Sequence, residues 1–297
     1  MYVSVAAMTR PTALGTPRDV TLAHATVRLF ESGPTDGPPV VFVHGVLANA
    51  DLWQHVLPRA AAAGLRCIAV DWPLGSHEIP VPDADLTPPG VADLVAELLV
   101  DLDLHDVTVV GNDSGGAITQ ILITRNPDRI ARVVLTPSDS FERFFPPLFA
   151  ALPVAARVPG APKVLTQALR ARWVQRLPIG YGWLTKHRMP DDVVDSFLRP
   201  SRERREIRED LTRFLRTVHR RHTLAAAEKL GGFDRPVLLA WATEDRVFPI
   251  SLAERLAERL PDATFARIDD SLTFVPLDQP EVLADLIVDF VGRDAAT

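Results

Sequence analysis

VTVVGNDSGG, residues 107–116, joins a continuous apolar run to a turn built from glycine and short polar residues. The run at 107–110 is typical of a strand buried on both faces. In a strand-to-helix nucleophile elbow the central residue carries the attacking group, and the residues two positions away on either side have minimal side chains. Gly111 and Gly115 meet this requirement around Asp113. The stretch therefore predicts an elbow with Asp113 as its nucleophile.

A second register of the same stretch would make Ser114 the nucleophile. That register places Asn112 where the strained turn favours a minimal side chain, so Asp113 is preferred. The choice determines the chemistry. A serine alkoxide attacks an acyl carbon, whereas a carboxylate displaces a leaving group from a saturated carbon and forms an alkyl ester on the enzyme.

The remaining apolar pattern predicts an α/β fold with a mostly parallel sheet. Alternating residues at 20–29 indicate an opening pair of strands. Helix-period segments separate most of the later strands, including 91–102 after Thr87, 251–260 after Pro249 and one beginning near Pro280. The continuous apolar runs that indicate buried strands lie at 40–43, 67–70, 107–110, 133–135 and 237–240.

The strand–helix rhythm stops for about a hundred residues after Leu135, where helical and proline-rich stretches follow. This interruption predicts a helical cap that covers a pocket. We expect a disordered tail at 1–17, a core at 18–138 and 234–297, and the cap at 139–233. Within the cap, the arginine-rich run at 199–221 predicts an amphipathic helix with pairs such as Arg205 with Glu209 and Glu209 with Arg213.

Composition narrows the class of partner. The chain has 297 residues, 47% of them hydrophobic, and a formal net charge of −6. This charge provides no general attraction for nucleic acid or an anionic membrane, so a small neutral or apolar substrate is expected. The one cysteine, Cys67, lies in a predicted strand and allows no internal disulfide, which favours a reducing cytoplasm. We expect a monomer or homodimer without a metal or cofactor.

The chain resembles the α/β-hydrolase superfamily over nearly its whole length, through His44-Gly45, the elbow and WATEDRVFP at 241–249. The resemblance implies a mostly parallel eight-stranded sheet flanked by helices, with an inserted helical cap. An aspartate at the elbow is similar to that of haloalkane dehalogenases and epoxide hydrolases. In those enzymes the aspartate attacks an alkyl halide or epoxide, and a histidine steered by an acid activates the water that releases the ester.

The same resemblance assigns roles around Asp113. Main-chain amides of Val46 and Ser114 would form the oxyanion hole. Two acids match the position of the orienting carboxylate: Asp245, which is preferred for its surroundings, and Asp139. Either acid could instead cap the segment that follows it. His44 could contact substrate, although bracing its own loop is the preferred interpretation.

The chain departs from these families at the catalytic histidine. DDSLTF at 269–274 places Thr273 at that position, where it would contact substrate, and threonine is no base near neutral pH. Hydrolysis of an ester on Asp113 would then be slow or would need another proton acceptor. His77, in a loop expected at the same sheet edge, is the candidate replacement, with a purely structural role as the alternative. Tyr181 is the one cap tyrosine available to protonate an epoxide oxygen.

Three functions therefore remain open. The first is an enzyme that forms an alkyl ester on Asp113, with an impaired hydrolytic step. The second is a lyase or isomerase in which Asp113 acts as a general base and no ester forms. The third is a hydrolase-like protein that binds a ligand without turnover, because fold alone does not determine function.

Overall fold

The computed structural model describes residues 14–292. Most of the predicted tail, residues 1–13, lies outside the described residues, and β1 begins at Pro17. Within the described residues one sheet contains eight strands, in the order β1-β2-β4-β3-β5-β6-β7-β8. The strands are β1 (Pro17–Thr21), β2 (Thr26–Ser32), β3 (Pro39–Val43), β4 (Arg66–Asp71), β5 (Val107–Asp113), β6 (Ile130–Ser138), β7 (Val237–Ala242) and β8 (Ala263–Ile268).

The sheet is antiparallel only at its first edge, where β1 pairs with β2 and β2 with β4. From β4 to β8 every pairing is parallel. The inner strands are buried on both faces, which explains their continuous apolar runs. The prediction of a mostly parallel eight-stranded sheet is thus confirmed, and Cys67 packs within β4 as expected.

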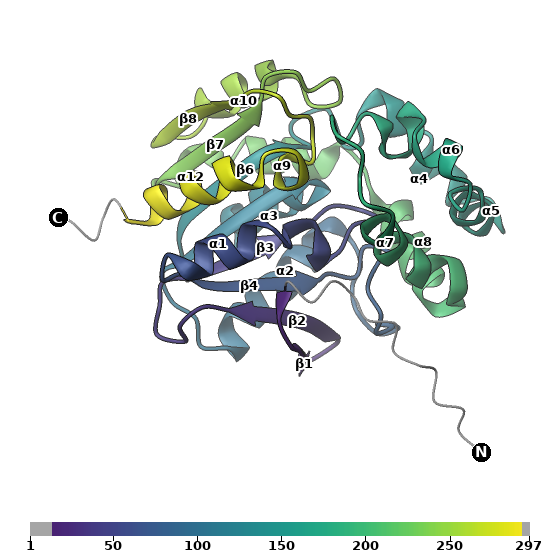
Figure 1. The fold of residues 1–297 in the computed structure, drawn as a ribbon, viewed down its shortest axis with the longest axis horizontal. Helices are drawn as coiled ribbons and strands as arrows, with labels where there is room; N and C mark the ends of the chain where they lie inside the picture. Colours follow the sequence, from purple (N-terminus) through teal and green to yellow (C-terminus); the bar gives the residue numbers. More distant parts are fainter. Residues whose placement is uncertain (1–13, 293–297) are drawn as a thin grey trace.

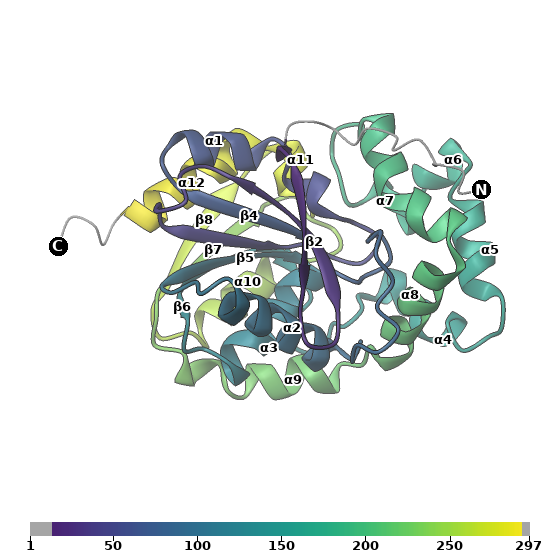
Figure 2. The ribbon, with the colours of Figure 1, turned by 90° about the horizontal axis from the view of Figure 1, so that it is seen from below.

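Helices cover both faces of the sheet (Figure 1). In Figure 2, α1, α11 and α12 lie on one face, and α2, α3 and α9 lie on the other. Thr87 caps the start of α2 by accepting a hydrogen bond from the amide of Gly90, as its sequence position indicated. The core helices are α1 (Val56–Ala62), α2 (Pro88–Asp101), α3 (Ser114–Arg125), α9 (Arg221–Ala227), α10 (Ile250–Ala257), α11 (Val275–Asp278) and α12 (Pro280–Gly292).

A group of helices at one end of the sheet forms the cap (Figures 1 and 2). Its members are α4 (Leu152–Ala155), α5 (Ala161–Ala168), α6 (Arg172–Gln175), α7 (Asp191–Glu203) and α8 (Arg205–Thr217). Short helical turns are η2 (Ala50–Trp53), η3 (Pro147–Phe149), η4 (Pro178–Gly182) and η5 (Leu230–Gly232). Because α9 and η5 pack against α3 of the core, the cap ends near Thr217 and not at the expected residue 233.

The arginine-rich run forms parts of two helices instead of one. Arg204 has an extended backbone and separates α7 from α8. The predicted pair of Arg205 with Glu209 is present, at 2.7 Å. Arg213 pairs with Asp210 at 3.0 Å instead of with Glu209. The run therefore contributes mainly an amphipathic surface, whose apolar residues face the interior of the cap.

The parallel arrangement positions the site. The strands β3, β5, β6 and β7 run in the same direction, so the loops that follow them open at one edge of the sheet. The cap lies over this edge (Figure 1). Residues far apart in sequence, such as Gly45, Asp113, Asp139 and Asp245, are thereby brought to one region.

Candidate active site

Asp113 occupies a strained turn between β5 and α3. Its backbone has φ 55° and ψ −131°, outside the regions that ordinary residues prefer. A Cβ on Gly111 would lie 2.6 Å from Thr119 Oγ1, and one on Gly115 would lie 2.2 Å from the carbonyl oxygen of Val43. Only glycine fits at these two positions, so the geometry matches an elbow centred on Asp113.

Ser114 does not occupy the strained position. It is the first residue of α3 and is fully buried. Among the described residues, none forms a hydrogen bond with its hydroxyl oxygen. The alternative register with Ser114 as nucleophile therefore has no geometric support.

Asp113 lines a mainly apolar cavity between the core and the cap. The volume open to the centre of a water-sized molecule is small, about 60 Å³, so the cavity would take a small molecule. Asp113 and Ser114 supply its polar side chains together with Tyr181. The lining residues are Val46, Leu47, Asp113, Ser114, Phe145, Phe149, Leu152, Leu165, Leu169, Ile179, Gly180, Tyr181 and Leu184. A small apolar molecule would contact the Asp113 carboxylate here.

The environment disfavours the charge on Asp113. Burial raises the pKa of Asp113 to about 7, the main-chain amide of Ser114 partly opposes this by favouring the ionised form, and the charge of Asp245 raises it further. An aspartate with this pKa exchanges its proton near neutral pH. The carboxyl group is therefore suited both to nucleophilic attack when ionised and to proton transfer.

The predicted oxyanion-hole residues, Val46 and Ser114, both line the cavity beside Asp113. Gly45 makes this close approach possible, because a Cβ at that position would lie 2.1 Å from Asp113 Oδ2. His44 lies behind the loop and is not among the cavity-lining residues. Its Nδ1 donates to the carbonyl oxygen of Gly45 at 2.8 Å, and its Nε2 accepts from the amide of Trp72 at 2.9 Å. His44 thus braces the loop and does not contact substrate.

Thr273, at the position where the sequence resemblance implies a histidine, is hydrogen-bonded to Asp245 and Asn112. Its Oγ1 donates to Asp245 Oδ2 at 2.8 Å, and its carbonyl oxygen accepts from Asn112 Nδ2 at 2.7 Å. Asp245 Oδ1 accepts the amides of Val247 and Phe248 at 2.7 and 2.8 Å. Thr273 is fully buried and does not line the cavity, so its expected contact with substrate is absent. Asn112, which the sequence analysis considered only in choosing the register of the elbow, links the Thr273–Asp245 pair to the elbow through this hydrogen bond.

Asp245 is held in an apolar surrounding. Burial raises its pKa to about 7, although hydrogen bonds from the amide of Phe248, the hydroxyl of Thr273 and the amide of Val247 partly oppose the shift. Asp245 thus caps the turn that follows β7, which was the alternative interpretation, and it also accepts a hydrogen bond from Thr273.

Asp139 follows β6 and lies behind the elbow. Its amide donates to the carbonyl oxygen of Asp113 at 3.4 Å. Its side chain is fully buried, and within residues 14–292 neither carboxylate oxygen forms a hydrogen bond. Burial and the charge of Asp113 raise the pKa of Asp139 well above its usual range, while the nearby Ser114 hydroxyl partly offsets the shift. Asp139 does not line the cavity, so it neighbours the nucleophile without facing substrate.

His77 is not brought to Asp113. Its Nε2 donates to Asp210 Oδ2 at 3.1 Å, and its Nδ1 accepts from the amide of Gly75 at 3.3 Å. Asp210 belongs to α8, so His77 fastens a cap helix to the loop after β4. With both ring nitrogens bonded and the ring outside the cavity lining, the interpretation of His77 as a replacement base is corrected to a structural role.

Tyr181 lines the cavity, but its hydroxyl is already engaged. The hydroxyl donates to the carbonyl oxygen of Leu47 at 2.7 Å. Burial and the charge of Asp113 raise its pKa. The described residues that line the cavity include no histidine, lysine or arginine. In the same part of the chain, no group of three or more His, Cys, Asp or Glu side chains is placed to hold a metal ion.

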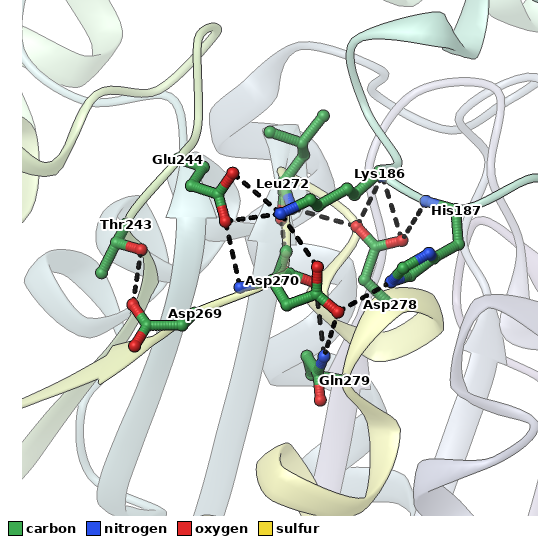
Figure 3. A network of polar contacts seen from close by, with 10 residues as sticks. Lys186, His187, Thr243, Glu244, Asp269, Asp270, Leu272, Asp278 and Gln279 are labelled. Atoms are coloured by element: carbon green, nitrogen blue, oxygen red, sulfur yellow. Dashed lines mark hydrogen bonds and ion pairs between the residues drawn. The ribbon is translucent and has the colours of Figure 1, made fainter.

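A polar network fixes the loop that carries Thr273 to the cap (Figure 3). Asp278 accepts the amides of Lys186, His187 and Leu272 at 2.8 to 3.0 Å. The Lys186 ammonium pairs with Glu244 at 2.6 Å and with Asp270 at 2.9 Å, and it holds the pKa of the Asp270 carboxyl below its usual range. The network holds the backbone around Thr273 in place from the outside.

Comparisons with known proteins agree with this architecture. An uncharacterized hydrolase of Bacillus subtilis is 26% identical over 257 residues, which are 85% of this chain and 89% of that protein. A haloalkane dehalogenase of Psychrobacter cryohalolentis is 36% identical over 108 residues, 36% of each chain. The structure of a haloalkane dehalogenase from Bradyrhizobium elkani superposes with a TM-score of 0.79 at 20% identity, covering 95% of this chain and 99% of that one.

The last comparison shows the shared fold, since its sequence identity is low. A family model for the alpha/beta hydrolase fold matches residues 38–280, which include the elbow, the cap and Thr273. This protein belongs to the α/β-hydrolase family, and its homologues include haloalkane dehalogenases.

Proposed function

We propose that this protein is an enzyme that forms an alkyl ester between Asp113 and a small apolar alkyl halide or epoxide, and that it releases this ester slowly. The observation that carries the proposal is the position of the Asp113 carboxylate, at the elbow and in the wall of an apolar cavity. The names of relatives that share part of the sequence, haloalkane dehalogenases among them, support the same substrate class.

The first step needs only groups that lie at the cavity. A carboxylate oxygen of Asp113 forms a bond to the saturated carbon of the substrate. With an alkyl halide, the carbon–halogen bond breaks and its electron pair leaves with the halide ion. With an epoxide, the carbon–oxygen bond breaks, and the oxygen keeps the electron pair, stays on the alkyl group and takes a proton from solvent. The apolar lining excludes water and keeps the carboxylate poorly solvated, which strengthens it as a nucleophile.

The second step lacks its usual base. Water must add to the carbonyl carbon of the ester and lose a proton, while the amides of Val46 and Ser114, two residues that line the cavity, would stabilise the oxyanion. The Thr273 hydroxyl donates its hydrogen to Asp245 and accepts no proton near neutral pH. General-base catalysis contributes about 10²–10⁴-fold, so ester hydrolysis should be slower by a factor in this range.

Intact-mass spectrometry tests the proposal directly. The protein is incubated with a panel of alkyl halides and epoxides, and an added mass equal to the alkyl group or the whole epoxide is expected. The adduct should be absent in Asp113→Asn and present in Asp245→Asn, which keeps the nucleophile. A broad panel that yields neither adduct nor product, with unlabelled ligand recovered unchanged, would instead favour a binding protein.

A second candidate function follows from the raised pKa of Asp113, about 7. A carboxylate with this pKa is suited to abstract a proton, as a lyase or isomerase requires. Turnover in heavy-oxygen water distinguishes the two candidates. Label that enters the product or Asp113 supports the ester, whereas turnover that depends on Asp113 without label uptake supports proton transfer.

A further inference from the structure

Charge is distributed unevenly along this chain. Between residues 143 and 190 the sequence contains no aspartate or glutamate, although the whole chain carries a net charge of −6. The same segment carries the cations Arg143, Arg157, Lys163, Arg170, Arg172, Arg176, Lys186 and Arg188. The expectation that an anionic membrane does not attract this protein came from the net charge of the whole chain. That value does not describe the local charge of this acid-free segment.

The acid-free segment forms the outer edge of the cap. It includes α4, α5, α6 and η4, which lie at the end of the molecule farthest from the sheet (Figures 1 and 2). We call residues 154–179 the outer cap face. Most of the large hydrophobic side chains that are exposed in the described chain lie on it, with Val164 and Trp173 each 69% exposed. Its exposed apolar side chains are Val154, Val158, Val164, Trp173, Leu177 and Ile179.

The cations of this face are poorly neutralised. All five Lys and Arg residues of this face, at positions 157, 163, 170, 172 and 176, are exposed. Within the described residues, no ion pair is formed by Arg157, Lys163, Arg170 or Arg176, and Arg170 contacts only the Gln167 amide oxygen, at 3.5 Å. The outer cap face thus combines exposed aliphatic and indole side chains with unpaired positive charge.

We propose that the outer cap face docks the protein on the surface of a bilayer that contains anionic phospholipid. Exposed apolar side chains enter the boundary between headgroups and acyl chains, and neighbouring Lys and Arg side chains bind the anionic headgroups. This combination is typical of proteins that lie on a membrane without crossing it. None of the described helices is long and apolar enough to span a bilayer, so the contact is with the interface.

The same features disfavour two other occupants. A second copy bound through this face would bring the unpaired cations Arg157, Lys163, Arg170 and Arg176 of two chains together, and their charges would repel. A nucleic acid would be attracted by the cations but would leave the aliphatic side chains Val154, Val158 and Val164 without an apolar partner. An anionic lipid surface offers negative charge to the cations and an apolar environment to the exposed aliphatic side chains.

Docking would also place the substrate cavity next to the lipid. Ile179 is 52% exposed on the outer cap face and also lines the cavity that contains Asp113. Apolar molecules concentrate in bilayers, so docking would deliver them to this side of the cap. The docking itself depends only on the surface and is independent of the reaction proposed for Asp113.

Vesicle co-sedimentation tests the proposal. The full-length protein is mixed with vesicles of phosphatidylcholine alone or of an equal mixture with phosphatidylglycerol. We expect binding to the mixed vesicles, weaker binding to phosphatidylcholine, and loss of most binding in high salt, which screens charge. The double variant Arg170→Glu/Arg176→Glu should bind the mixed vesicles more than about tenfold less tightly. Trp173→Ala should also bind less tightly.

A matched control variant makes the same change in net charge at a site away from the outer cap face. Lys229 and Arg259 are exposed and lie near the amino ends of β7 and β8, away from the cap. Lys229→Glu/Arg259→Glu should bind vesicles as the wild type does. All variants should retain whatever adduct formation the wild type shows without vesicles, so failure of docking is distinguishable from failure of the proposed reaction.

Four results would count against the proposal. One is equal binding to both vesicle types, and another is unchanged binding by Arg170→Glu/Arg176→Glu. The third is a dimer in sedimentation velocity that Trp173→Ala converts to a monomer, which would make a second copy the occupant. Displacement of the protein from vesicles by a short oligonucleotide at equal phosphate concentration would favour nucleic acid and count against lipid.

Discussion

Thr273 Oγ1 donates a hydrogen bond of 2.8 Å to Asp245 Oδ2 in a region closed to solvent. Asp245 therefore has a buried partner whose side chain does not titrate near neutral pH. Asp113, in contrast, lies in the wall of the cavity. In the reaction proposed above, Asp113 would form the ester and Thr273 would not supply the base that hydrolyses it.

Thr273→His should accelerate ester release. An imidazole bonded to Asp245 would supply the general base, and the release rate should rise by roughly 10²-fold or more if the larger side chain is accommodated. The measurement is the decay of a preformed Asp113 adduct, followed by intact mass. Thr273→Val is the matched control, because it removes the hydrogen bond without adding a base and should leave the decay rate low.

The rate of adduct formation should depend on pH. The nucleophile is the ionised form of Asp113, whose pKa is raised to about 7. The rate should therefore rise about tenfold per pH unit below neutrality and level off above it. Asp245→Asn should shift the midpoint to lower pH, because the charge of Asp245 is one cause of the raised pKa. A midpoint near pH 4 in the wild type would contradict the burial of the carboxylate.

Asp113→Asn should stabilise the fold at alkaline pH. Folding raises the pKa of Asp113 from 3.8 to about 7. The carboxylate therefore destabilises the folded state most above about pH 7, where it is ionised in both the folded and the unfolded protein. The variant should gain of the order of 2–4 kcal/mol at pH 8 and nothing at pH 4, measured by thermal or denaturant unfolding. Asp270→Asn is the contrast, since Lys186 lowers that pKa and its loss should not stabilise the protein at pH 8.

Gly45→Ala should remove activity while the fold remains. The added Cβ would lie 2.1 Å from Asp113 Oδ2, so the carboxylate must move away from its position in the cavity. We expect adduct formation to fall by about 10²-fold or more. Gly232→Ala provides the control, because a Cβ there meets no atom within 4 Å, and circular dichroism would verify folding of both variants.

His77→Ala should reduce stability and leave the chemistry unchanged. The substitution removes the imidazole partner of the buried Asp210 carboxylate, which keeps its ion pair with Arg213 and the hydrogen bond from the Val81 amide, so a cost of about 1–3 kcal/mol is expected. The rate of adduct formation per folded molecule should match that of the wild type. A rate that falls with unchanged stability would restore His77 as a participant in the reaction.

Much of the fold could be predicted because its signals are local. Buried parallel strands require continuous apolar runs, and the runs at 40–43 and 237–240 lie within β3 and β7. β8 was not assigned to residues in advance, since its side chains are mostly half-buried and its pattern is weak. The core position of α9 was also missed, because helical periodicity shows that a face is buried but not against which element.

The candidate site, too, was predictable from sequence only in part. The elbow at Asp113 follows from sequence alone, because the small residues on either side of it are a steric requirement of the turn itself. The threonine at position 273, where the resemblance implies a histidine, is likewise visible in sequence. The orientation of His77 depends on Asp210, which is 133 residues away, and the pKa of Asp113 depends on burial by the cap. Backbone sterics act between neighbours in the chain, whereas burial and side-chain partners are set by packing between distant segments, and only the tertiary structure decides them.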